Sequence, residues 1–94
     1  MRTVIAFDIS DDRRRYRVVK VLKEYATRVQ KSVFEAGDLK RAVYLRMRSR
    51  LEREIDPATD SIRYYQLCDA CVARVEHYGA GPGILDPPAK VAIV

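Results

Sequence analysis

The sequence is poor in the residues from which metal sites and acid–base sites are commonly built. Its 94 residues contain one histidine, His77, and two cysteines, Cys68 and Cys71. One chain therefore cannot supply four cysteines, or two cysteines with two histidines, to a zinc ion. No histidine lies near the acidic residues of the N-terminal region, so we expect no histidine general base there.

Long apolar stretches are absent as well. The first apolar run is short and alternating, and it contains Asp8, so we expect no signal peptide. No segment is long enough to span a membrane, and the chain has neither an internal repeat nor a low-complexity segment. We therefore expect one small cytoplasmic domain without a membrane partner.

The two cysteines form a C-x-x-C motif, which in a cytosolic chain is typical of thiols or a metal rather than a structural disulfide. A redox motif of this kind would follow a strand and open a long helix of a thioredoxin-like unit. Here the motif lies between segments that we predict to be short strands. We expect Cys68 and Cys71 to be small, buried packing residues at a tight turn.

Acidic residues are scarce in residues 12–31. This stretch has eight Lys or Arg against Asp12 and Glu24, a net charge of +6, whereas the rest of the chain nets −1 and the whole chain +5. Such clustering is typical of a surface that binds a phosphate backbone, and the alternative is a solvated helix face. The eight bases are Arg13, Arg14, Arg15, Arg17, Lys20, Lys23, Arg28 and Lys31.

A strand is predicted to open the chain. In TVIAFDI, alternation places Val4, Ala6 and Asp8 on one face and residues 3, 5, 7 and 9 on the other, and both sets are mostly apolar. Helices from the rest of the chain can cover one face, so we expect the face with Asp8 to meet a second copy of the protein. Alternatively, Asp8 is an acid of the following turn or helix cap.

The first helix is predicted to begin at Asp12, with Ser10, Asp11 or Asp12 as its cap. Periodicity places Arg15 near the end of the first strand, where it would pair with Asp8 or hold a phosphate beside it.

The rest of the chain adds a bent extended segment, a second helix capped by Asp38, and short strands. This order predicts an α/β (α+β) sandwich of ferredoxin-like βαββαβ type with an extra C-terminal strand. We expect residues 1–79 to form the domain, residues 80–89 a Gly/Pro linker, and residues 90–94 a strand exchanged with a dimer partner. The predicted elements are a helix over 12–25, extended chain over 28–36, a helix over 39–55, and strands over 61–67, 75–78 and 90–94.

Three stretches together resemble the CRISPR-associated Cas-two family: the opening VIAFDISDDRRR, the central RVQKSVFEAG, and the DSIRYYQLC that follows a helix ending in IDP. The resemblance covers nearly the whole chain, in order and with matching spacing. It implies a ferredoxin-like homodimer with facing sheets that serves in spacer acquisition, bridging dimers of the Cas-one integrase along double-stranded prespacer DNA. Some members of this family are described as metal-dependent nucleases that act on single-stranded RNA or double-stranded DNA.

By this resemblance the family aspartate, the candidate catalytic and metal-binding residue, is Asp8. Phe7 stands before it where the family often has tyrosine, so this aromatic contributes no hydroxyl. The resemblance adds Ser32 and Phe34 to the nucleic-acid-binding candidates and supports three of the arginines. The full set of candidates is Arg13, Arg14, Arg15, Arg17, Arg28, Lys31, Ser32 and Phe34.

Phosphodiester hydrolysis needs an activated water and charge stabilisation, which a divalent ion between carboxylates supplies. One aspartate per chain is too few, but a dimer axis that pairs Asp8 with its mate would make one shared Mg²⁺ site completed by waters. Without an ion, the two carboxylates would repel and one would take a proton. We therefore favour an adaptor over a nuclease. The alternatives are a stand-alone, toxin-like Mg²⁺-dependent endoribonuclease and a plain ferredoxin-like RNA-binding module, although the latter usually exposes basic or aromatic residues on its sheet.

Overall fold

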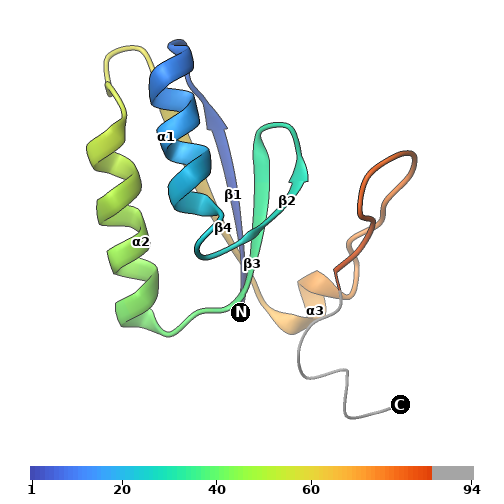
Figure 1. The fold of residues 1–94 in the computed structure, drawn as a ribbon. Coiled ribbons are helices and arrows are strands. Elements are labelled where there is room, and N and C mark those ends of the chain that lie inside the picture. The colour runs from blue at the N-terminus through green and yellow to red at the C-terminus, as the bar shows by residue number, and fades with distance from the viewer. Residues whose placement is uncertain (86–94) are drawn as a thin grey trace.

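The computed structural model describes residues 1–85 of the chain as one four-stranded antiparallel sheet with helices. The strand order is β2-β3-β1-β4, so the first strand lies in the interior of the sheet between β3 and β4. This is the ferredoxin-like βαββαβ arrangement that the sequence predicted (Figure 1). The elements are β1 (Arg2–Asp8), α1 (Asp12–Leu22), β2 (Thr27–Gln30), β3 (Val33–Asp38), α2 (Arg41–Glu54), β4 (Ser61–Leu67) and α3 (Asp69–Val72).

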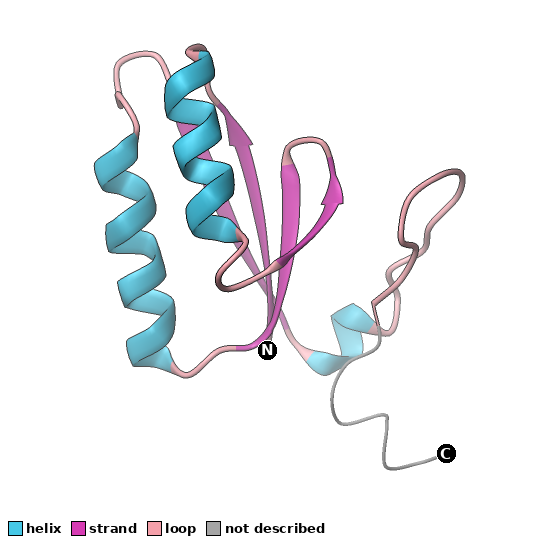
Figure 2. Ribbon diagram, viewed as in Figure 1, coloured by secondary structure: helices cyan, strands magenta, loops and turns pink. Residues whose placement is uncertain are grey.

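The core lies between the sheet and the two long helices. From β1, Ile5 and Phe7 point into it, and from α2 Met47 and Leu51 are fully buried. Both helices lie side by side on the same face of the sheet, and α3 lies beyond one end of the sheet instead of in the helix layer (Figure 2). The predicted alternation along the first strand is confirmed, because its odd-numbered residues face the helices.

The extended segment is two strands, as its adjacent apolar residues suggested. β2 and β3 pair antiparallel, and the register shifts between Arg28 and Gln30. Ordinary alternation along β3 places Phe34 in the core with 0% exposure while Val33 stays partly exposed on the other face.

Asp38 does not cap the second helix, and that prediction was wrong. β3 continues through Asp38, which pairs with Arg2 of β1, and its carboxylate accepts a hydrogen bond from the N-terminal amine of Met1 at 3.0 Å. α2 begins only at Arg41, after the N-cap Lys40, which forms no side-chain capping bond. Strand pairing with β1 therefore extends the strand beyond Gly37, where the sequence suggested that it would end.

The predicted short strand over residues 75–78 is also wrong. The chain forms the single helical turn α3 after β4 and then runs without regular structure, with Tyr78 fully exposed. A strand needs a neighbour to satisfy its backbone groups, and residues 75–78 have none among the described residues. Residues 90–94 and the last four residues of the predicted linker, 86–89, lie outside the described range. Within residues 1–85, no helix is both long and apolar enough to cross a membrane.

Candidate nucleic-acid interface

Four loops and element ends meet at one end of the sheet, which we call the Asp8 end. Here β1 finishes at Asp8, α1 begins, the β2–β3 turn approaches β1, and the loop between α2 and β4 closes the edge (Figure 1). The backbone N–H of Phe7 donates to the carbonyl of Ser32 at 3.1 Å, and Asp8 lies opposite Ser61 in the sheet register. Most of the sequence-predicted site residues therefore gather at this end.

Asp8 is exposed on the face of the sheet that α1 and α2 leave open. Its carboxylate accepts no hydrogen bond from any described residue. The cap of α1 is Asp11, whose side chain accepts from the backbone N–H of Arg14 at 2.9 Å. The alternative in which Asp8 serves as the helix cap is therefore excluded, because Asp11 caps α1.

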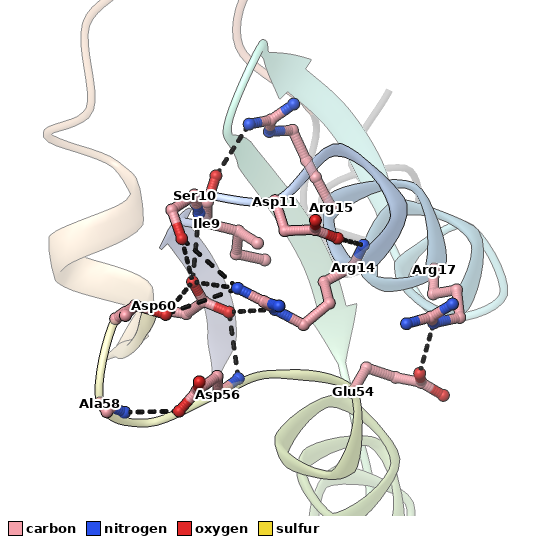
Figure 3. Close-up of polar contacts among 11 residues, drawn as sticks. Ile9, Ser10, Asp11, Arg14, Arg15, Arg17, Glu54, Asp56, Ala58 and Asp60 are labelled. Atoms are coloured by element: carbon pink, nitrogen blue, oxygen red, sulfur yellow. Dashed lines mark hydrogen bonds and ion pairs between the residues drawn. The ribbon is translucent and has the colours of Figure 1, made fainter.

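The acid that organises the loops is Asp60, which was not among the candidate site residues. Its side chain is fully buried, and its oxygens accept from Arg14 Nε at 2.8 Å, from the N–H and hydroxyl of Ser10, both at 3.1 Å, and from the N–H of Asp56 at 3.0 Å. The Thr59 hydroxyl donates a further bond at 3.1 Å. Figure 3 shows these bonds converging from the β1–α1 loop, the first turn of α1 and the α2–β4 loop.

Hydrogen bonding by Arg14 holds the pKa of Asp60 well below its ordinary value, assisted by the N–H groups of Asp56 and Ser10. The same pair raises the pKa of Arg14. Both groups are therefore charged at neutral pH. Their ion pair holds the first turn of α1 against the loop that leads into β4. The Arg14 guanidinium uses its Nε and Nη2 in this network, so its predicted contact with nucleic acid competes with a structural role.

Arg15 does not pair with Asp8, although the sequence left that option open. Its guanidinium donates to the carbonyl of Ile9 at 2.8 Å (Figure 3) and also forms an ion pair with Asp12. Arg17 pairs with Glu54 of α2 at 3.1 Å. Both arginines are thus held by partners from their own chain, and both still carry partly exposed side chains.

Arg28 curls over the β2–β3 turn. Its Nε and Nη2 donate to the carbonyl of Lys31 at 3.1 and 2.6 Å, and its guanidinium lies 5.7 Å from the centre of the Phe34 ring. Phe34 itself is fully buried, so its prediction as a residue that touches nucleic acid is corrected. It supports Arg28 from below and packs against Phe7.

The bases of the stretch 12–31 differ in whether an acid of the described chain pairs with them. Among the described residues, five of its eight bases form no ion pair. Arg13 and Lys31 are exposed close to the Asp8 end, and Arg13 shares a helix face with the exposed Tyr16. The five are Arg13, Lys20, Lys23, Arg28 and Lys31.

A resident metal does not fit the donors of one chain. Within residues 1–85 no group of three or more His, Cys, Asp or Glu side chains is placed to hold an ion. Asp8 offers a single carboxylate, whereas Mg²⁺ requires near-octahedral oxygen coordination. Any ion at Asp8 therefore needs ligands from outside the single chain.

Asp60 is the residue that sequence reasoning missed. Its neighbours read Asp56-Pro57-Ala58-Thr59-Asp60, and nothing in that pattern separates Asp60 from Asp56 as the buried acid. Only the tertiary structure shows the role of Asp60, because its partner Arg14 lies 46 residues earlier in the sequence. Arg14 was identified as a base, but its internal partner was not foreseen.

Comparison with protein families matches residues 1–75 to the model described as CRISPR associated protein Cas2. A protein of Chloroflexus aurantiacus named CRISPR-associated endoribonuclease Cas2 3 is 47% identical over 87 residues, covering 93% of this chain and 92% of that one. Among solved structures, Cas2 of Streptococcus pyogenes aligns with a TM-score of 0.74 and 34% identity, over 84% of this chain and all of that one. A chain of a partial Cas6-RT-Cas1–Cas2 complex aligns with a TM-score of 0.75 and 26% identity over 93% of each chain.

Proposed function

The chain belongs to the CRISPR-associated Cas2 family, and from that membership we propose that it acts in spacer acquisition as a nucleic-acid-binding homodimer that joins a Cas1 integrase to prespacer DNA. The likeness to a chain from a complex that contains Cas1 and Cas2 supports the integrase partner. The observation that carries the proposal is the presence of Arg13 and Lys31, two exposed bases without an ion-pair partner among the described residues, close to the Asp8 end. Phosphate groups bind such bases without regard to sequence, as an adaptor on varied spacers requires.

The proposed dimer uses the face of the sheet opposite α1 and α2. Val4 and Ala6 lie there partly exposed, and Tyr65 of the neighbouring strand is 44% exposed beside them. Burying such apolar surface against a second copy would stabilise a chain whose own core is small. The same packing would carry Asp8 of each protomer toward the two-fold axis.

In the proposed complex, Arg13 and Lys31 contact phosphates directly, because neither is engaged by a described partner. Arg28 is pre-oriented by the Lys31 carbonyl, and its Nη1 has no hydrogen-bond partner among the described residues. Arg15 and Arg17 attract phosphates more weakly, because Asp12 and Glu54 offset part of their positive charge. Ser32 marks the turn that holds Lys31 next to β1. We assign double-stranded DNA as the main ligand and single-stranded RNA as the alternative.

The second candidate function is a Mg²⁺-dependent endonuclease, and the name of the Chloroflexus relative supports it. Asp8 is the residue that would bind the ion, and its exposed, unbonded carboxylate is the specific observation in favour. Because one chain is insufficient, the two Asp8 carboxylates of a dimer would be the protein ligands. A bound ion would supply an activated water and stabilise charge on the phosphate.

Light scattering on the purified chain, alone and mixed with a cognate Cas1 integrase and a mixed-sequence DNA duplex, tests the adaptor. We expect a dimer alone and a larger assembly in the mixture. A monomer that joins no assembly at any concentration tested would contradict the proposal.

The nuclease is tested separately with Asp8→Asn, which removes the charge and keeps the shape. Cleavage of single-stranded RNA and of duplex DNA is measured with Mg²⁺ and with EDTA. If the endonuclease assignment holds, cleavage disappears in Asp8→Asn and in EDTA, while Asp69→Asn, an exposed acid at the other end of the sheet, cleaves normally. Cleavage by Asp8→Asn at the wild-type rate would remove Asp8 from the reaction.

A further inference from the structure

The C-x-x-C motif is arranged differently from the sequence expectation. Both Cys68 and Cys71 are free and exposed, so their prediction as buried packing residues is wrong. Cys68 directly follows β4 and is the N-cap of α3, and Cys71 lies in that helical turn. The fold therefore brings both side chains to the same side of one turn, where their sulfur atoms lie 3.4 Å apart.

We propose that Cys68 and Cys71 are a reversible dithiol–disulfide pair that exchanges with disulfide compounds and, when oxidised, locks the turn joining the sheet to the C-terminal segment. The sulfur atoms are already in contact, and a disulfide at about 2.05 Å requires only a small further approach. Two exposed thiols at this separation also give an external disulfide free access.

The two thiols are not equivalent. The backbone N–H of Cys71 lowers the pKa of the Cys68 thiol, helped by the Cys71 thiol and the N–H of Ala70. The thiol of Cys71 itself has a raised pKa, because it shares the hydrogen bond with Cys68 and would be charged beside it. Cys68 is therefore the attacking sulfur and Cys71 the resolving one.

The exchange balances as follows. The Cys68 thiolate attacks one sulfur of an external disulfide, forms a mixed disulfide and releases the first external thiolate. Cys71 then loses its proton and attacks the Cys68 sulfur, which releases the second. The protein gives up two protons and two electrons, the external disulfide takes the electrons, and both of its halves leave as thiols after protonation.

A metal site is the competing use of a cysteine pair. In the described residues the two thiols have no third His, Cys, Asp or Glu placed to complete a site. His77, the only histidine of the chain, bonds instead to the carbonyl of Ala80 at 3.1 Å. Two thiols alone leave a zinc ion half coordinated, so the geometry favours the disulfide.

The lock would act on a weakly held element. α3 is one turn, closed by the bonds from Val72 N–H to the Cys68 carbonyl at 2.9 Å and from Ala73 N–H to the Asp69 carbonyl at 3.1 Å, with Val72 buried beneath it. A bond between the two sulfurs would join the start of this turn to its third helical residue. Oxidation would thus hinder opening of the turn and fix the direction in which the chain leaves β4.

The test begins with the reduced full-length chain incubated with oxidised glutathione, quenched with an alkylating reagent and digested with trypsin. The peptide over residues 64–74 contains both cysteines and no internal cleavage site. We expect it to lose two hydrogen atoms and to carry neither glutathione nor the alkylating group. We also expect C71S to trap glutathione on Cys68, and C68S to react several-fold more slowly.

Four results would overturn the proposal: stable glutathione adducts without the internal disulfide, disulfide-linked dimers, no oxidation at all, or zinc retained between copies as seen by native mass spectrometry. Equal reactivity of C68S and C71S would overturn the assignment of Cys68 as the attacking thiol. Native trypsin cleavage after Arg74 reports on the lock. Cleavage after Arg74 should be several-fold slower in the oxidised chain than in the reduced chain. Equal cleavage rates in the two forms would show that the disulfide does not lock the turn.

Discussion

The two ends of the sheet are built in opposite ways. At the Asp8 end, a single fully buried carboxylate, Asp60, accepts hydrogen bonds from three segments of the chain. At the other end, which we call the Arg2 end, the ion pair between the Met1 amine and Asp38 is exposed. Arg2 is buried there and forms one long ion pair, from its Nη1 to Glu35 at 3.5 Å, while its Nε lacks a hydrogen-bond partner among the described residues. The difference predicts that the Asp8 end is more rigid than the Arg2 end.

The largest effect should come from breaking the network at the rigid end. Asp60→Ala leaves Arg14 and the N–H groups of Ser10 and Asp56 without their acceptor, so we expect the melting temperature to fall by on the order of 10–20 °C. Asp38→Ala, which removes an exposed pair at the Arg2 end, should lower it by roughly 0–5 °C. Calorimetry gives the melting temperatures of both variants. Equal decreases in melting temperature would show that the two ends of the sheet are stabilised to the same extent.

Hydrogen exchange should show the same contrast without a mutation. The amides of Ser10 and Asp56 donate to a buried carboxylate, so we expect slow exchange for two loop positions. The amides of Val72 and Ala73 close the one-turn helix α3 and should exchange faster. Slower exchange in α3 than at Ser10 would reverse the assignment of rigid and adjustable ends.

The pH dependence of stability gives a smaller effect. Hydrogen bonding lowers the pKa of Asp60 in the folded chain, so its stabilising effect is fully present above the ordinary aspartate pKa, near 4. That contribution is lost as the pH falls below 4 toward the lowered value. Thermal unfolding of wild type and Asp60→Asn should therefore differ most at neutral pH and converge in acid. A difference that stays constant down to the lowest measurable pH would show that Asp60 is not ionised in the network.

Most of the fold could be predicted from the sequence because it depends on local periodicity. Alternation identified the buried face of β1, and apolar residues at helical spacing mark the buried faces of α1 and α2. Val18, Leu22, Met47 and Leu51 belong to these faces and are fully buried. Boundaries that depend on tertiary pairing were missed. β3 continues to Asp38 because Arg2 of β1 pairs with it, and residues 75–78 form no strand because none of the described strands pairs with them.

The sequence indicated which residue types belong to the candidate site. It did not indicate which residues of the same chain bind them. Charge clustering grouped the bases of residues 12–31, but it could not separate Arg14, which is bound to Asp60, from Arg13, which has no ion-pair partner among the described residues. Phe34 was named as a candidate because the resemblance placed it in a site motif, but strand alternation puts its side chain on the buried face of β3. A contact between residues 46 positions apart in the sequence, such as Arg14 and Asp60, leaves no local pattern from which it could be predicted.

The central claim is that nucleic acid binds at the Asp8 end through bases that no acidic residue of the described chain engages. The most direct measurement is the salt dependence of binding to a mixed-sequence DNA duplex for wild type, for Arg13→Ala with Lys31→Ala, and for the control Lys40→Ala with Arg41→Ala at the Arg2 end. Each pair removes one lysine and one arginine, and all four side chains are exposed.

The slope of log K against log salt should become shallower by about 0.9 for each lost phosphate contact in the first double variant, with weaker binding to every sequence tested. The control should keep the wild-type slope. Equal slopes in the two double variants would contradict the claim, because they would show that overall charge, and not the Asp8 end, determines binding.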